Sequence, residues 1–174
     1  SRQSLAAALE SLATGLRPRL KGLVICLSKS WGGLEQVAAQ DVLDATARGL
    51  CLKAVVLADS PIHRHLAQQS GVDVLPLDFR PRNYFDFKLR ALLAELLELS
   101  GDGGVNLIHT HQTSILGSLV PWLWNENVPI FASRHIMNNH SKRNPMYRLI
   151  YGRLDGLLVM SHALRRNVLD THAI

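Results

Sequence analysis

The sequence predicts an α/β fold: a parallel sheet with helices on both faces. Short apolar runs, rich in Val, Ile and Leu, recur six times between residues 22 and 161. Stretches with helical spacing separate these runs. Strands that are apolar on both faces are typical of a parallel sheet covered on both sides. The right-handed crossover rule then gives a doubly wound, Rossmann-like sandwich.

The expected elements alternate along the chain. Strands are expected at "GLVICLS" (22–28), "LKAVVLA" (52–58), "VDVLPL" (72–77), "VNLIHTH" (105–111), "VPIFASR" (128–134) and "GLLVMS" (156–161). Helices are expected over residues 34–48, 62–69, 84–100, 114–125, 145–153 and 162–169, the last capped by Ser161. Residues 1–16 also have helical spacing, which Arg17-Pro18-Arg19 ends. The chain therefore divides into an N-terminal helical extension, 1–20, and one Rossmann-like domain, 21–174.

Composition narrows the possible classes of protein. The chain has 174 residues, 47% of them hydrophobic, which suits one compact domain. A net charge of +5 favours anionic partners, but the basic residues are scattered and are not interleaved with aromatic ones, so a nucleic-acid partner is not expected. Cys26 and Cys51 fall in or beside apolar runs and are expected to be buried free thiols. With no transmembrane or signal-peptide pattern, the expected compartment is the cytoplasm.

The stretch "KSWGGLE" follows the first strand, where ligands of such sheets bind. Gly32 and Gly33 allow a tight turn and a close approach of the backbone to a ligand. Their amides and the helix N-terminus form a site suited to an anion such as a diphosphate. A plain turn with Glu35 as a capping carboxylate remains an alternative. The spacing matches neither GxGxxG nor a P-loop.

Histidines and basic residues end two later strands. His109 and His111 are two residues apart and are expected to share one face of the fourth strand. We interpret them as groups that orient a sugar or phosphate, with a purely structural role as the alternative for His109. A metal site is a less favoured interpretation, because no third ligand has a suitable spacing. Arg134 and His135 close the fifth strand and are candidate phosphate contacts. Lys142 and Arg143 follow them, as further contacts or as solvated charge.

Taken together, these motifs resemble one protein family. "WGGLE" (31–35), "LIHTH" (107–111), "VPIFASRH" (128–135) and "RLDGLLVMSHALRRNV" (153–168) are similar, in order and spacing, to the N-terminal half of GT-B retaining nucleotide-sugar glycosyltransferases, group 1 or subfamily 4-like. The resemblance runs from about Lys21 to the end of the chain. It implies transfer of a sugar from a nucleotide-sugar donor to an acceptor hydroxyl, without a metal or other cofactor.

The resemblance also implies roles for individual residues. His135 would be the catalytic residue beside the reacting sugar. Gly32, Gly33 and Arg134 would contact the donor phosphates or sugar. Glu35, His111, Lys142 and Arg143 would lie on the acceptor side, with Glu35 also supporting the glycine loop. The charge in "SRH" departs from the small or hydroxyl residues more usual before this histidine.

The sequence also departs from the family in extent. Family members carry a second, C-terminal domain that binds the donor, and this chain ends after the sixth α/β unit. We therefore expect an isolated acceptor half that is inactive alone. The positive charge, the N-terminal helix and the Arg80-Pro81-Arg82 loop suit a glycan or glycolipid acceptor of lipopolysaccharide type, with peripheral contact at the inner membrane. Two alternatives remain: half of a nucleotide-sugar 2-epimerase, and a non-catalytic flavodoxin-like module that binds phosphate or nucleotide.

Overall fold

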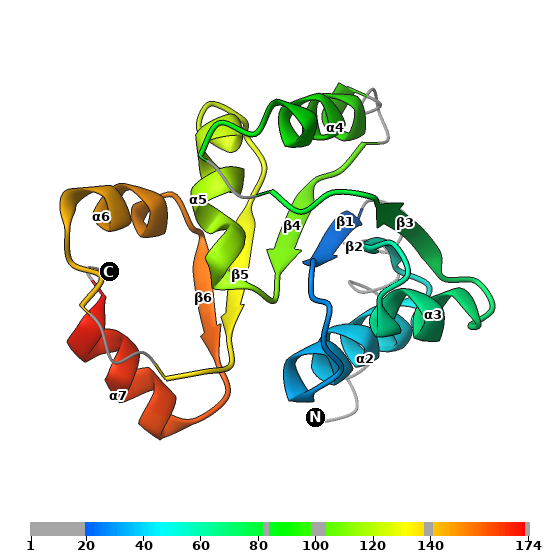
Figure 1. Cartoon of the computed structure of the whole chain (residues 1–174), viewed down its shortest axis with the longest axis horizontal. Helices are drawn as coiled ribbons and strands as arrows, with labels where there is room; N and C mark the ends of the chain where they lie inside the picture. Colours follow the sequence, from blue (N-terminus) through cyan, green and yellow to red (C-terminus); the bar gives the residue numbers. More distant parts are fainter. Residues whose placement is uncertain (1–19, 82–83, 99–103, 138–140, 173–174) are drawn as a thin grey trace, which may run out of the picture.

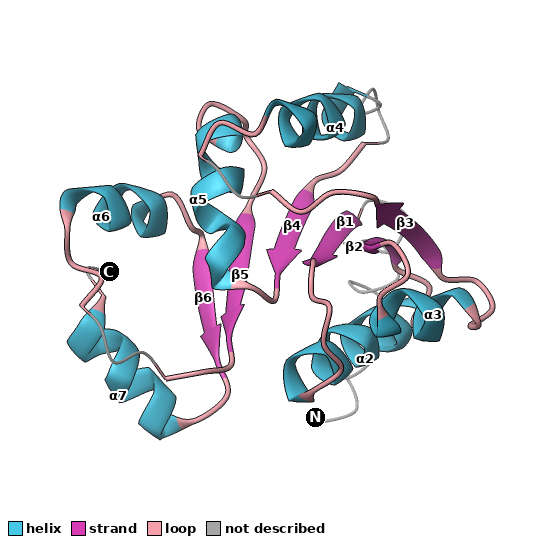
Figure 2. Cartoon of the chain, viewed as in Figure 1, coloured by secondary structure: helices cyan, strands magenta, loops and turns pink. Residues whose placement is uncertain are grey.

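The computed structural model describes residues 20–81, 84–98, 104–137 and 141–172. Six parallel strands form one sheet in the order β3-β2-β1-β4-β5-β6, as expected for a Rossmann-like half of a GT-B protein (Figures 1 and 2). The strands are β1 (Lys21–Cys26), β2 (Cys51–Leu57), β3 (Asp73–Leu77), β4 (Leu107–Thr110), β5 (Ile130–Arg134) and β6 (Gly156–Val159). The predicted N-terminal helix lies outside the described residues.

Helices cover both faces of this sheet (Figure 1). They are α2 (Gly33–Ala47), α3 (Pro61–Ala67), α4 (Phe87–Glu98), α5 (Leu116–Leu119), α6 (Pro145–Gly152) and α7 (His162–Thr171). Two 3₁₀ turns, η1 (Thr113–Ile115) and η2 (Val120–Leu123), flank α5. Among these described elements, none is long and apolar enough to cross a membrane.

Local chemistry sets where several helices begin. Ser60 Oγ accepts a hydrogen bond from the His63 amide at 3.2 Å, and Pro61 occupies the first helical position of α3. The Ser161 hydroxyl accepts from the Leu164 amide at 3.1 Å, which confirms the predicted cap of α7. The predicted helix 114–125 is wrong as one continuous element. It is divided into η1, α5 and η2, and the change from α5 to η2 falls at Pro121, which lacks the N–H that a continuing α-helix needs.

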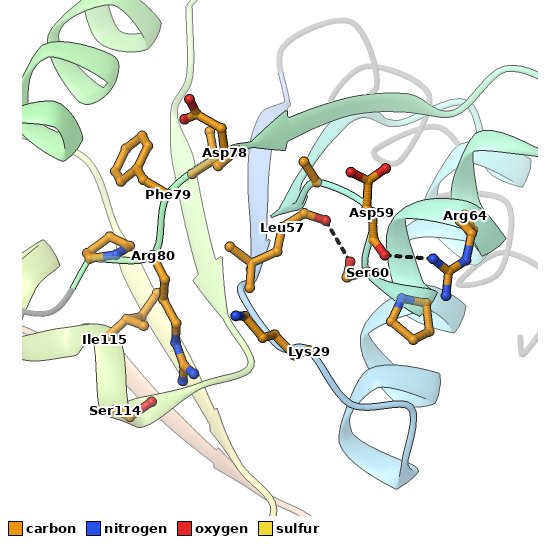
Figure 3. A pocket seen from close by; sticks show the side chains of 14 residues that line it. Lys29, Leu57, Asp59, Ser60, Arg64, Asp78, Phe79, Arg80, Ser114 and Ile115 are labelled. Carbon is orange, nitrogen blue, oxygen red and sulfur yellow. Dashed lines mark hydrogen bonds between the residues drawn. The ribbon is translucent and has the colours of Figure 1, made fainter.

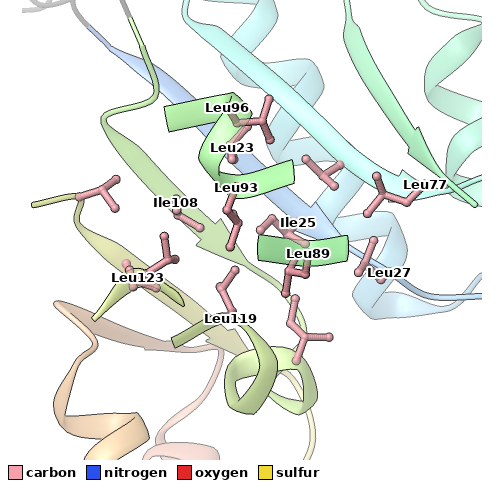
Figure 4. Close-up of a cluster of buried hydrophobic side chains, with 14 of the residues drawn as sticks. Leu23, Ile25, Leu27, Leu77, Leu89, Leu93, Leu96, Ile108, Leu119 and Leu123 are labelled. Atoms are coloured by element: carbon pink, nitrogen blue, oxygen red, sulfur yellow. The ribbon is translucent and has the colours of Figure 1, made fainter. Parts of the chain in front are cut away.

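The core has one apolar layer on each side of β1. Leucines of α4 and the α5 region pack on one face, against Leu23, Ile25 and Leu27 (Figure 4). Alanines and Val42 of α2 pack on the other face, against Val24 and Cys26. Cys26 is buried, as expected, but Cys51 is exposed because it starts β2 at the open amino end of the sheet.

Removing a side chain from the larger layer tests this packing. Leu119 is 0% exposed, and Leu119→Ala should lower the free energy of unfolding by about 3 kcal/mol, since it leaves a cavity. The matched control is Leu149→Ala, because Leu149 lies on the exposed face of α6. Urea unfolding measures both. Equal effects of the two substitutions would contradict the assignment of this core.

Candidate functional site

The sheet order reverses between β1 and β4, and polar segments leave both strands there. The chain runs outward from β1 through β2 to β3, whereas β4, on the other side of β1, starts the second half. In open α/β sheets, ligands bind outside the carboxyl ends of the strands at this point. The His111 amide donates to the Ile25 carbonyl at 3.1 Å. The residue after β4 is therefore held beside the end of β1.

The loop after β1 is fixed by Glu35. The Gly32 amide, at the N-terminus of α2, donates to a carboxylate oxygen of Glu35 at 2.8 Å, and Glu35 is buried. Burial raises the pKa of this carboxyl, but hydrogen bonds from Ser28, from the Gly32 amide and from its own amide outweigh that effect and lower it. An ionised Glu35 thus supports the glycine loop from inside, as the resemblance implied.

The backbone conformation does not itself demand glycine in this loop. Gly32 has φ −132° and ψ −163°, an extended conformation open to other residues. A Cβ on Gly33 would meet no described atom within 4 Å, and one on Gly32 would come no closer than 3.4 Å, to Glu35 Oε2. The space beside both α-carbons is therefore open to a ligand.

Three histidine rings lie in a row at the ends of β4 and β5. The ring centroids of His109 and His111 are 4.3 Å apart, and those of His111 and His135 are 5.5 Å apart. Nδ1 of His111 lies 3.3 Å from Nε2 of His135, and Nε2 of His109 lies 2.8 Å from the Ser133 hydroxyl. The row brings together the three histidines that the sequence singled out, His109, His111 and His135.

The middle ring of the row is neutral. His111 is 1% exposed. Burial, followed by the neighbouring rings of His109 and His135, lowers its pKa to about 3. Burial also lowers the pKa of His135, against the opposing effect of the Asp41 and Glu35 carboxylates. A neutral imidazole has one N–H and one free nitrogen. The contact between His111 and His135 is therefore an N–H···N hydrogen bond that orients the His135 ring.

Asp41 of α2 adds a carboxylate to this row. Its Oδ2 lies 3.3 Å from Nε2 of His111, and ligand atoms of Asp41, His109 and His111 lie within 4.8 Å of one another. Two imidazoles and one carboxylate form a donor set that a divalent ion such as zinc accepts. No third metal ligand is evident from the sequence, because Asp41 lies on a helix far from both histidines in the chain. Other contacts of the two rings leave Nδ1 of His109 and Nε2 of His111 for such an ion.

Arg134 lies on the opposite face of the sheet from His135. Its Nη1 donates to the Thr113 hydroxyl at 3.2 Å. Tyr151 of α6 is a neighbour, since burial raises the pKa of its hydroxyl and the charge of Arg134 opposes that rise. Adjacent residues at the end of a strand point to opposite faces, and the two side chains contact different groups, Thr113 for Arg134 and His111 for His135. These contacts of Arg134 include neither Gly32 nor Gly33, so the grouping implied by the resemblance stays a prediction.

Lys142 and Arg143 join the segment after β5 to the end of α7. The Lys142 amide donates to the Thr171 carbonyl, and Arg143 Nη2 donates to the Leu169 carbonyl at 3.1 Å. The Lys142 ammonium lies 5.0 Å from the centroid of the Tyr147 ring, on the Arg134 face. Lys142 thus joins Arg134, whereas Arg143 binds a backbone carbonyl at the end of a helix.

A wide hollow of about 1070 Å³ lies at the ends of β1, β2 and β3 (Figure 3). Lys29, Arg64 and Arg80 line it, with the carboxylates of Asp59 and Asp78. Arg64 Nη1 donates to the Asp59 carbonyl at 2.7 Å, so one of the three cations is already engaged. The mixed charge and the open shape suit a polar ligand such as a sugar.

Sequence reasoning did not find Asp41, Tyr151 or His172. Asp41 is one residue before the buried Val42 of α2. The helical spacing of α2 does not indicate that Asp41 contacts a histidine of another element. His172 and Tyr151 meet through a 3.2 Å contact between Nε2 and the hydroxyl. They lie on different elements, so no local pattern in the sequence signals this contact.

The neutral His111 predicts a loss of stability in mild acid. With the pKa near 6.5 in the unfolded chain and about 3 in the folded one, the unfolded state binds more protons between these values. Stability should therefore fall as the pH falls from 6.5, with His111 contributing roughly 2 kcal/mol by pH 5.

Urea unfolding at pH 7 and pH 5 measures this effect. His111→Gln should reduce the difference in stability between the two pH values. His162 is an exposed histidine in the first turn of α7, and His162→Gln should preserve that difference. An unchanged difference in His111→Gln would contradict burial of a neutral ring.

Residues 31–174 of this chain match the model of Glycosyltransferase Family 4. The fold matches Alr3699/HepE of Anabaena in complex with UDP and glucose, with a TM-score of 0.63 and 16% identity, over 87% of this chain and 41% of that chain. The same protein in complex with UDP gives a TM-score of 0.66, with the same identity and coverage.

MurG of Acinetobacter baumannii matches 80% of this chain and 41% of its own, at 10% identity and a TM-score of 0.49. A comparison with curated proteins finds no match. The chain spans less than half the length of HepE, and its fold corresponds to one half of a GT-B protein. The chain therefore belongs to glycosyltransferase family 4, as an N-terminal domain of that family.

Proposed function

We propose that this chain is the acceptor-side half of a retaining glycosyltransferase that moves a sugar from a nucleotide-sugar donor to a glycan or glycolipid. The observation that carries the proposal is the meeting of the open glycine loop with an oriented, neutral histidine at the switch point. Contacts link the two parts: Asp41 of α2, the helix that begins at the loop, lies 3.3 Å from Nε2 of His111, and Nδ1 of His111 lies 3.3 Å from Nε2 of His135. The charges of Glu35 and His135 also affect each other's pKa.

The two parts suit different steps of sugar transfer. When the bond to the diphosphate breaks, negative charge develops on the leaving oxygen and positive charge on the sugar ring. The start of α2 carries partial positive charge, and a Cβ on Gly33 would meet no described atom within 4 Å, whereas the Gly32 amide already donates to Glu35. We therefore propose that the diphosphate approaches the backbone at Gly33. His135, held by His111, can hydrogen-bond a hydroxyl of the sugar without adding a full positive charge beside the ring.

Donor and acceptor follow as parts of the same proposal. HepE was crystallised with UDP and glucose, so UDP-sugars are the first donors to test. The hollow lined by Lys29, Arg64 and Arg80 is the proposed place of the acceptor. The acceptor is proposed to belong to bacterial envelope synthesis of lipopolysaccharide type, reached at the inner membrane surface. The remaining donor contacts are proposed to come from a second domain, so the 174-residue chain alone should not turn over.

A transfer assay tests the proposed activity. The longest natural protein that contains this chain is incubated with labelled nucleotide-sugars and a lipid and glycan extract of the source cell. His135→Ala should lower the transfer rate by about 100-fold, the usual cost of losing an aimed polar group beside the reacting centre. His162→Ala is the matched histidine control. The proposal would be contradicted if the wild-type protein transferred sugar from none of the nucleotide-sugars tested, or if His135→Ala kept the wild-type rate.

Gly33→Ala separates ligand approach from folding. An added Cβ meets no described atom, and alanine favours a helix, so stability should hold or rise by about 0.5 kcal/mol. The Cβ would occupy the proposed path of the donor, and transfer should fall by at least about tenfold. Gly152→Ala, with equally open surroundings at the end of α6, should have the same small effect on stability and none on transfer. Full transfer by Gly33→Ala would show that the donor does not approach this loop.

A further inference from the structure

Arg134 is a buried cation with no carboxylate partner in the described part of the chain. Arg134 is 7% exposed, and its Nε atom is buried and has no hydrogen-bond partner among the described residues. Its contacts, Thr113 and Tyr151, are neutral hydroxyl groups. Burying a charge is unfavourable unless an opposite charge compensates for it. The surroundings of Arg134 therefore call for an anion.

A second cation faces the same region. The Lys142 ammonium lies 5.0 Å from the centroid of the Tyr147 ring and 6.0 Å from that of Tyr151. Burial, and then the charge of Arg134, lowers the pKa of Lys142. Such a shift indicates that positive charge is crowded here and would be relieved by an anion.

The third basic group in this region is kept neutral. Burial, followed by the charges of Arg134 and Lys142, lowers the pKa of His172 to about 4. Its Nδ1 lies 2.8 Å from the Thr171 hydroxyl, which donates to the Asn167 carbonyl at 2.6 Å. Nδ1 therefore carries the proton, and Nε2 accepts from the Tyr151 hydroxyl at 3.2 Å. This chain of bonds fixes Tyr151 beside Arg134.

A cavity of about 170 Å³ opens among these groups. Polar residues that line it include Thr113, Ser114, Lys142, Tyr147 and Tyr151, and no Asp or Glu is among its described lining residues. The larger hollow differs, since two carboxylates accompany its cations. The small cavity is thus lined by hydroxyl groups and by the Lys142 ammonium. The guanidinium of Arg134 contacts one of the lining residues, Thr113, and has no carboxylate partner among the described residues.

We propose that this cavity binds a phosphate group, with Lys142, Thr113 and Ser114 as contacts and Arg134 as the buried countercharge that positions them. Resting on the proposed function, we assign this phosphate to the acceptor, because Gly32, Gly33 and His135 form the donor site and His135 lies on the opposite face of the sheet from Arg134. The acceptor class would then be a phosphorylated glycan or lipid. This assignment also gives a role to the arginine of "SRH".

Calorimetric titration of the 174-residue chain with inorganic phosphate tests the site. Lys142→Gln should weaken binding about tenfold, the cost of one charge-assisted hydrogen bond. Lys53→Gln removes an equivalent charge near the amino end of β2, where Lys53 pairs with Asp73, and should leave the affinity unchanged. Arg134→Gln should also weaken binding, and circular dichroism checks that each variant is folded. Absence of saturable binding at millimolar phosphate, or equal losses in Lys142→Gln and Lys53→Gln, would overturn the site.

A second titration distinguishes the source of the phosphate. UDP binding to the longest natural protein should be the same for wild type and Lys142→Gln if the cavity serves the acceptor. A parallel loss of UDP affinity would overturn that assignment and place the donor phosphate in the cavity. Phosphate binding to the chain does not depend on transfer activity, so failure of the proposed function and failure of this site give different results.

Discussion

The pleat of β5 is the constraint on which the arrangement of functional groups depends. Ser133 and His135 point to the face that carries the histidine row, whereas Arg134 points to the face covered by α5 and α6. One strand end therefore supplies two separate environments, one neutral and one cationic. A shift of register by one residue would exchange them. The pairing of β5 with β4 and β6 keeps that register fixed.

Desolvation gives each environment its character. On the first face, burial keeps His111 neutral, and hydrogen bonds keep the buried Glu35 ionised, so the glycine loop and the His135 ring are both held in place. On the second face, burial leaves Arg134 charged but without a carboxylate among the described residues. The first environment is preorganised for a polar ligand, and the second retains an electrostatic demand that a ligand would satisfy.

The sequence was sufficient for the sheet and for the strand ends, because apolar runs and glycine turns are local signals. It placed all six strands, the capping serine of α7 and the shared face of His109 and His111. Pro121 is a local signal that apolar spacing outweighed, so the helix predicted to continue through it was wrong. Tertiary contacts are not visible in the sequence, and Asp41 reached the histidines from another element. The grouping of Arg134 with the glycines followed its position in a motif and stays a prediction.

The most direct test of the central claim is a crystal structure of the longest natural protein that contains this chain, with a bound nucleotide-sugar. The account predicts that the transferred sugar and its diphosphate lie against the backbone of Gly32 and Gly33, with the His135 ring in contact with the sugar. A donor bound with no contact to this loop or to His135, for example in the cavity beside Lys142, would contradict the assignment of the switch point as the reaction site.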